Sequence, residues 1–174
     1  MRWFLIPTLL FSVIVGGAAR AEPTSNGTTY FDYGVFCALE TVNTMEAEDT
    51  ISGVVNLLAE TPVFLKQTTV VPARIGVGFG VHVDIPPEFG NVAVLSMEHP
   101  PMGPNAVTHE TWVSQYNAGQ INYNGFTFEY DYELEPGVWT LSSSMNGRKI
   151  YEVEFNVIDA SLMPGLTCDG AFLS

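Results

Sequence analysis

The chain has 174 residues, of which 19 are acidic and 6 are basic, so its formal net charge at pH 7 is −13. A field of that sign disfavours binding to nucleic acids and anionic membrane surfaces, and favours solubility and cationic partners or metal ions. The length suits one domain, which we expect to span residues 22–174.

The first 21 residues have the pattern of a secretory signal peptide. Arg2 precedes an apolar run from Trp3 to Val15, and the small-residue sequence Ala19-x-Ala21 follows. The run is shorter than the ~20 residues of a membrane-spanning helix. Cleavage after Ala21 would leave four basic and nineteen acidic residues, a net charge of −15. We therefore expect a periplasmic or secreted protein.

The first predicted strand follows a polar segment. Apolar and polar side chains alternate from Phe31 to Leu39, which places Cys37 on the inward face with the aromatic residues. Residues 40–61 stay undecided, because their apolar positions have helical spacing while Ser52-Gly53 and the β-branched residues favour a strand. Residues 63–71 are strand-like, and Pro72 either ends regular pairing or marks an edge.

Residues 76–85 form a strand with two unlike faces. One face is apolar, whereas the other carries Gly76, Gly78 and Gly80 before His82 and Asp84. A row of glycines leaves backbone almost bare. It predicts either a ligand or another backbone lying close to the sheet, or a bent or bulged strand packed under a neighbouring segment.

The middle of the chain predicts three more strands. Residues 92–99 are apolar enough on both sides for a central strand, which we expect Pro100-Pro101 to stop, and residues 107–116 form the next. From Phe126 to Leu134 the alternation is the clearest in the chain. Its aromatic face should meet the core, and its acidic residues should face solvent; these are Glu129, Asp131, Glu133 and Glu135.

Residues 134–158 predict a β-hairpin. Asn146-Gly147 suits a type I′ turn, since both residues tolerate positive φ. The return strand alternates with a period of two and turns four apolar residues to the core: Tyr151, Val153, Phe155 and Val157. Residues 159–174 have no strand pattern. Cys168 lies in this tail, and in an oxidising compartment we expect it to form a disulfide with Cys37.

About seven short strands, separated by turn residues and without a long amphipathic helix, predict an all-β protein. The expected architecture is an immunoglobulin-like antiparallel β-sandwich of about seven strands, with a closed barrel as the alternative.

Three groups of residues support a family resemblance. Thr69-x-Val71-Pro72-Ala73-x-x-Gly76-x-x-Phe79-Gly80 comes first, followed by Glu98-His99-Pro100-Pro101 and then by Pro136-Gly137-x-Trp139-Thr140. The chain resembles an exported bacterial family known only as domain of unknown function 3859, from about Tyr33 to Ile158. The resemblance implies a periplasmic, Gram-negative setting. It implies no activity, cofactor or catalytic residue.

Two metal sites can be considered from the sequence. Met97, His99, Met102 and His109 form a soft set of ligands suited to exported copper, but each also has an ordinary structural explanation. Zinc held by His82, His99 and His109 would require three separate strands to converge. The acidic run could hold calcium, although it lacks EF-hand spacing and is more typical of a solvated sheet face.

The sequence carries none of the common hydrolase motifs, Gly-x-Ser-x-Gly, His-Glu-x-x-His or Ser-x-x-Lys. We therefore expect a non-enzymatic binding or interaction module without a cofactor, whose partner is a protein or a small molecule. A periplasmic copper protein is the alternative. The first candidate contact is the loop from His99 to Thr108, stiffened by Pro100, Pro101 and Pro104, with Met102 exposed near its tip. The alternative for this loop is that Met102 packs onto the domain.

Overall fold

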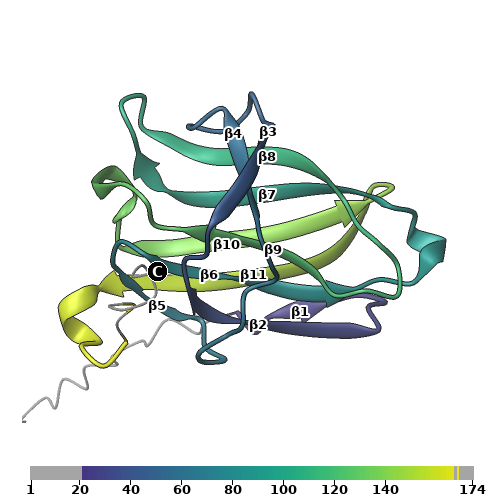
Figure 1. Ribbon diagram of the computed structural model, residues 1–174, viewed down its shortest axis with the longest axis horizontal. Helices are drawn as coiled ribbons and strands as arrows, with labels where there is room; N and C mark the ends of the chain where they lie inside the picture. The colour runs from purple at the N-terminus through teal and green to yellow at the C-terminus, as the bar shows by residue number, and fades with distance from the viewer. Residues whose placement is uncertain (1–20, 167, 169–174) are drawn as a thin grey trace, which may run out of the picture.

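The computed structural model describes residues 21–166 and residue 168, and it consists of eleven strands with three short 3-10 helices (Figure 1). The strands are β1 (Thr24–Ser25), β2 (Tyr30–Cys37), β3 (Thr41–Glu46), β4 (Val54–Leu58), β5 (Val70–Ala73), β6 (Val77–Asp84), β7 (Val92–Met102), β8 (Val107–Gln115), β9 (Asn122–Thr127), β10 (Gly137–Met145) and β11 (Arg148–Asp159). The 3-10 helices are η1 (Pro87–Phe89), η2 (Asp131–Glu133) and η3 (Ala160–Leu162). The predicted signal peptide, residues 1–21, lies almost entirely outside the described residues.

Two sheets pack face to face and enclose the core, which confirms the predicted immunoglobulin-like sandwich. The larger sheet has the order β1-β11-β10-β7-β8, with β5 also paired to β11, and the smaller has the order β2-β6-β9. All pairs are antiparallel except that of β5 with β11. A separate two-stranded sheet, β3-β4, runs across the direction of the long strands (Figure 1).

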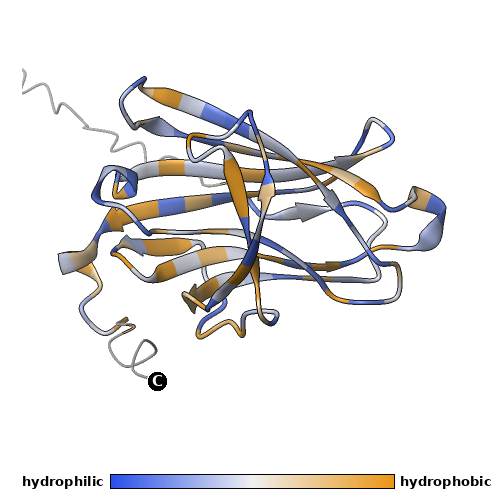
Figure 2. Ribbon diagram, turned by 45° about the horizontal axis from the view of Figure 1, so that its top comes forward, coloured by the Kyte–Doolittle hydropathy of each residue, from blue (hydrophilic) through white to orange (hydrophobic). Residues whose placement is uncertain are grey.

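The predicted hairpin is present and central to the larger sheet. Asn146 and Gly147 have φ of 49° and 73°, as a type I′ turn requires. Trp139 pairs with Phe155, and all the inward residues of β11 are buried. The alternation is visible as orange bands between paler or blue ones along the long strands (Figure 2).

Aromatic rings join the two sheets at the centre of the core. Phe79 of β6 lies 4.7 Å from Phe155 of β11 and 5.8 Å from Trp139 of β10, measured between ring centroids. Phe128 lies 5.7 Å from the Trp139 ring in an edge-to-face arrangement. Such pairs add about 0.5–1.5 kcal/mol to the burial of their area, so this cluster holds one sheet against the other.

The predicted disulfide between Cys37 and Cys168 is present. It spans 131 residues of sequence and joins the end of β2 to the segment that follows η3. The two Cα atoms lie 5.5 Å apart. The bond therefore ties the smaller sheet to the end of the chain.

The glycine face of β6 lies under a neighbouring segment, as the second alternative held, but the register shows no bulge, and backbone lies close to the sheet as the first alternative held. The Phe36 ring lies over Gly78, and a Cβ built at Gly34 on the adjacent strand β2 would lie 2.5 Å from the carbonyl oxygen of Lys66. The β2–β6 register runs without a bulge, so the strand is regular and only its covering is tight. Glycine is required because the neighbouring segment lies so close.

The structure settles the undecided region and corrects the one after it. Residues 40–61 form the β3–β4 hairpin, not a helix. In the predicted strand 63–71, only the last two residues belong to a strand, β5, which continues through Pro72. The preceding residues follow β2 instead, where Val35 exchanges backbone hydrogen bonds with Leu65 and Lys66. Pro72 is tolerated because β5 pairs with β11 alone.

Two further strand boundaries differ from the prediction. Strand β7 does not stop at Pro100-Pro101 but continues to Met102, with an irregular register between Glu98 and Met102. Proline removes N–H donors but keeps the chain extended, so the pairing slips and resumes. The predicted strand 126–134 is also wrong, because β9 ends at Thr127 and the chain then turns through η2.

Candidate functional site

A cavity of about 180 Å³ lies where the sandwich is open at one side, under the β3–β4 hairpin. Strand β8 is one edge of the larger sheet and β9 is one edge of the smaller, and the hairpin bridges these two edges. The cavity is lined by four aromatic side chains, three glutamates and several residues of β4; they include Trp112, Tyr123, Phe126, Tyr130, Glu110, Glu129, Glu133, Val54, Val55 and Leu58. We call it the hairpin cavity.

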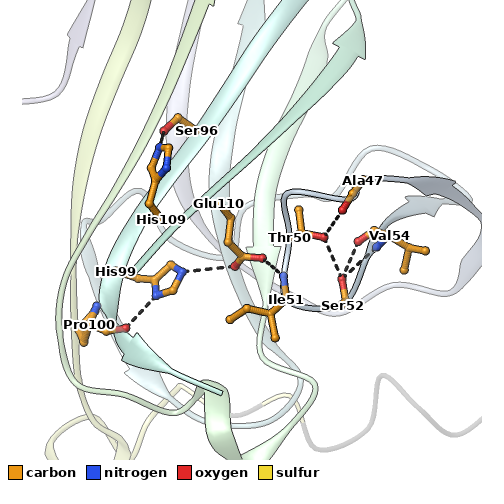
Figure 3. Close-up of polar contacts among 10 residues, drawn as sticks. All are labelled: Ala47, Thr50, Ile51, Ser52, Val54, Ser96, His99, Pro100, His109 and Glu110. Atoms are coloured by element: carbon orange, nitrogen blue, oxygen red, sulfur yellow. Dashed lines mark hydrogen bonds and ion pairs between the residues drawn. The ribbon is translucent and has the colours of Figure 1, made fainter. Parts of the chain in front are cut away.

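Polar contacts attach the hairpin to the two sheet edges. At the β3–β4 turn, the backbone N–H of Ile51 donates to Glu110 Oε2 at 2.7 Å (Figure 3). The carbonyl oxygen of Asp49 accepts from the N–H of Thr111 at 3.1 Å. On the other side, Asn56 Nδ2 donates to Glu129 Oε1 at 2.9 Å. Two of these three contacts use carboxylates that line the cavity, so the hairpin is hydrogen-bonded directly to the lining residues.

His99 and Glu110 form a buried pair behind this wall. His99 Nδ1 lies 2.8 Å from the carbonyl oxygen of Pro100, which can only accept, so Nδ1 carries a proton. Nε2 of the same ring lies 3.3 Å from Glu110 Oε1 (Figure 3). A neutral ring would turn its lone pair toward a carboxylate there. The two side chains form an ion pair only when the ring is protonated on both nitrogens, and Nε2 has no hydrogen-bond partner among the described residues.

Glu133 is the second buried carboxylate of the cavity. Its Oε2 atom accepts hydrogen bonds from the backbone N–H groups of Glu129 at 2.6 Å and Tyr130 at 2.9 Å. Only 7% of the residue is exposed. Burial raises the pKa of Glu133, as do the charges of Glu129 and Glu110, against the opposing effect of the two N–H donors. The carboxylate is thus held in place by the turn that it caps.

The four residues of the predicted copper site do not converge. Met97 and Met102 are buried in the core, with 0% and 3% exposed, and His99 is paired with Glu110. His109 lies on the opposite, outer face of the sheet, where Nε2 is 2.8 Å from Ser96 Oγ (Figure 3). Adjacent residues of a strand point to opposite faces, and His109 pairs with the exposed Glu98 rather than with His99.

The three histidines considered as zinc ligands are also apart. His82 lies on the outer face of the smaller sheet, stacked on Phe64 at 4.1 Å between ring centroids, whereas His99 points into the sandwich. Burial lowers the pKa of His82, although the charge of Asp32 opposes this. Across residues 21–166 and 168, no three histidine, cysteine, aspartate or glutamate side chains are grouped closely enough to hold a metal ion.

The predicted binding loop is shorter than expected. His99, Pro100, Pro101 and Met102 belong to β7, and only residues 103–106 form the turn to β8, including Pro104. Met102 packs onto the domain, as the alternative held. The loop therefore offers no exposed methionine at its tip.

Alternation in the sequence assigns Glu133 to a solvated strand face, with calcium binding by the acidic run as the other possibility, and does not mark Glu110 or Trp112 as site residues. Glu110 shares the inward face of β8 with Trp112, so its position on the apolar side of an alternating strand was an available signal. Alternation alone does not reveal the 3-10 turn in which Glu133 lies. The capping interaction of its carboxylate with the Tyr130 N–H is visible only in three dimensions.

Comparison with known proteins supports the class that this fold defines, an immunoglobulin-like β-sandwich. A crystal structure of an immunoglobulin-like protein from Pseudomonas aeruginosa is similar, with 24% identity, a TM-score of 0.51, and coverage of 82% of this chain and 100% of that one. The family model for Domain of unknown function (DUF3859) matches residues 24–157, and the chain belongs to this family, as the resemblance indicated. No curated protein matches it. In the described part of the chain, no helix is long and apolar enough to cross a membrane.

Proposed function

We propose that the protein is an exported, non-enzymatic binding module and that it holds its partner in the hairpin cavity. The observation that carries the proposal is the position of this cavity between one edge of the larger sheet and one edge of the smaller, under a hairpin that belongs to neither. Cavities lined mainly by apolar and aromatic side chains with a few placed polar groups are the usual form of a ligand site. A purely structural hairpin would be expected to close the gap with core side chains.

The attachment of the hairpin supports a role in access to the cavity. Most residues of β3 and β4 are exposed or half-buried, so few apolar contacts hold them. Segments with few buried contacts open locally at a lower free energy than the core strands. The rigid sandwich would keep Glu110, Trp112 and Phe126 fixed while the hairpin adjusts to what enters.

Export is supported by the disulfide, which is typical of oxidising compartments. The acidic composition and the signal-peptide pattern of the first 21 residues agree with a periplasmic or secreted location.

The test uses one pair of matched variants of the hairpin. Val55→Trp should fill the cavity, because Val55 is part of its lining, whereas Val42→Trp adds the same ring to an exposed position of β3. Wild type and both variants would serve as baits in a periplasmic extract, and bound proteins and small molecules would be identified by mass spectrometry. We expect a component that wild type and Val42→Trp retain and Val55→Trp loses. An identical set on all three baits would end the proposal.

A further inference from the structure

We propose that His99 and Glu110 act as a pH-sensitive latch, which holds the β3–β4 hairpin over the hairpin cavity in acid and releases it as the pH rises. This inference rests on the proposed function, because it concerns how access to the same cavity is controlled. The latch is the chain of contacts from the His99 ring through the Glu110 carboxylate to the backbone N–H of Ile51, at the turn of the hairpin (Figure 3).

Both side chains of the latch are buried, and one nitrogen atom of the ring has no hydrogen-bond partner. His99 and Glu110 are each 6% exposed. Nδ1 of His99 donates to the carbonyl oxygen of Pro100, whereas Nε2 is a buried atom without a partner among the described residues and lies 3.3 Å from Glu110 Oε1. A buried polar atom without a partner carries a desolvation cost. The group that faces Nε2 is itself an acceptor, so a proton between the two atoms would satisfy both.

The groups around the ring favour its protonated state, and burial opposes it. Glu110 faces the ring from β8, and the charge of Glu133 interacts with those of Glu110 and Glu129, so three carboxylates contribute to the field on this side. Trp139 of β10 lies against the imidazole, with 4.9 Å between ring centroids, and an aromatic face attracts a cation at this distance. The Tyr132 hydroxyl near Glu110 stays neutral, because burial raises its pKa. Among the described residues, no lysine or arginine forms an ion pair with these glutamates.

The pair attracts or repels according to its proton content. An imidazole ordinarily gains and loses its charge between about pH 5 and pH 8. With the proton present, Nε2 and Oε1 attract each other, whichever atom holds it, and Oε2 stays where it accepts from Ile51. Without the proton, a nitrogen lone pair faces a negative oxygen at 3.3 Å, which is repulsive. Because Glu110 also lines the cavity, its carboxylate can turn into that space and leave the Ile51 N–H without its acceptor.

Loss of the Ile51 contact would loosen the hairpin at one side. The turn would keep the hydrogen bond from the Thr111 N–H to the carbonyl oxygen of Asp49, and the other side would keep the bond from Asn56 to Glu129. Strands β3 and β4 are exposed or half-buried, so each polar contact is a large share of what attaches them. Proton loss should therefore favour opening of the hairpin while the sandwich stays folded.

The experiment measures hydrogen exchange of single backbone amides in the disulfide-bonded protein between about pH 5 and pH 8. Each rate is expressed as a protection factor, which removes the intrinsic dependence of exchange on pH. We expect the protection factor of Ile51 to fall at least about fivefold as the pH rises across this range, and that of Leu141 in β10 to stay constant. The 15N shift of His99 Nε2, followed in parallel, should change over the same interval.

Two variants remove the latch in different ways. His99→Gln has no proton to lose in this pH range, and Glu110→Gln has no charge but can still accept from Ile51. In each variant the fall in Ile51 protection with rising pH should be absent. Glu110→Gln keeps the shape of the residue and carries the test if His99→Gln fails to fold. The matched control is His109→Gln, on the outer face of β8, which should keep the wild-type pH dependence.

Three results would overturn the latch: Ile51 protection that does not fall with rising pH, an equal fall at Leu141, or a fall that both glutamine variants of the pair retain. None of these results would affect the proposed function, because the comparison of Val55→Trp with Val42→Trp at one fixed pH tests only whether the cavity holds a partner. Failure of that comparison with the pH dependence intact would leave a proton-controlled hairpin but remove the ligand site under it.

Discussion

The β10–β11 and β3–β4 hairpins are built from the same local structure but are stabilised differently. In β10–β11, every second side chain enters the core, and Trp139, Leu141, Val153 and Phe155 are essentially inaccessible to solvent. In β3–β4, the apolar residues Val42 and Leu57 are 60% and 41% exposed. The second hairpin adds little to the core and is attached mainly through its turn and side-chain contacts.

The difference indicates how the protein can be both rigid and adaptable. Burial of apolar area makes β10–β11 part of the cooperative unit, whereas a few polar contacts, each worth about 0.5–1.5 kcal/mol net, attach β3–β4. A ligand site between a fixed wall and a lightly attached cover can be rearranged without unfolding the sandwich.

The largest expected effect on stability is in the β10–β11 hairpin. Phe155→Ala should lower the free energy of unfolding by about 3–5 kcal/mol, because it opens a void beside Phe79 and Trp139. Urea titration followed by Trp fluorescence measures this loss. Glu154→Ala, the next residue on the outer face, should cost little. Similar losses for the two variants would contradict the assignment of β11 to the core.

A smaller and more local effect on stability is expected at the β3–β4 hairpin. Glu110→Ala removes the acceptor of the Ile51 N–H and the partner of His99, and should cost about 1–3 kcal/mol. Amide hydrogen exchange should accelerate around Ile51 far more than in β10–β11. Glu110→Gln, which can still accept from Ile51, should accelerate it less. Uniform acceleration throughout the protein would show that β3–β4 is not a separate unit.

The next-largest effect on stability is expected at the turn of the β10–β11 hairpin. Gly147→Val should cost about 1–2 kcal/mol through backbone strain alone, because φ is 73° and nothing lies within 4 Å of an added Cβ. Gly147→Asn is the matched control and should cost less, since asparagine tolerates positive φ. The melting temperatures of the two variants provide the measurement. An unchanged value for the valine variant would be inconsistent with the type I′ turn.

The smallest effect has the opposite sign. Glu133→Gln keeps an acceptor for the two N–H groups but loses the charge, and should raise stability at neutral pH by under about 1 kcal/mol. The pKa of Glu133 is higher in the folded protein than in the unfolded chain, so ionisation of this carboxyl group destabilises the wild-type fold as pH rises through the folded-state pKa. The advantage of the variant should therefore disappear below the ordinary glutamate range. Thermal unfolding at several pH values tests this, and an advantage that persists in acid would be contrary to the expectation.

Period-two alternation predicted the sandwich well wherever one face of a strand is buried. The hairpin from Gly137 to Asp159, the strand β6 and the Cys37–Cys168 bond were all predicted correctly, because each depends on local pattern or on residue pairing. One of the errors has a local cause. In residues 126–134 the alternation continues past the end of pairing, and only the capping of η2 by Glu133 shows where the strand stops.

The candidate site could not be predicted in the same way. Glu110, Glu129 and Val55 come together because a hairpin crosses from one sheet edge to the other, and no spacing in the sequence encodes that crossing. The residues of the predicted copper site show the opposite case, because they are close in the sequence but apart in the structure. Met97, His99 and His109 are close in the sequence, yet alternation along β7 and β8 sends His99 and His109 to opposite faces.

The disulfide determines how the protein responds to mechanical force. A pull applied to the two ends of the chain is carried through Cys37 and Cys168, so the loop between them, closed over a sequence separation of 131, bears no load. Strands β3 to β11, and with them the hairpin cavity and the hairpin over it, lie inside that loop, whereas β1 and β2 lie outside it. Only after reduction could the loop extend, by up to about 450 Å of contour length at roughly 3.5 Å per residue. While the bond is intact, tension therefore acts on β1 and β2 and not on the residues that line the cavity.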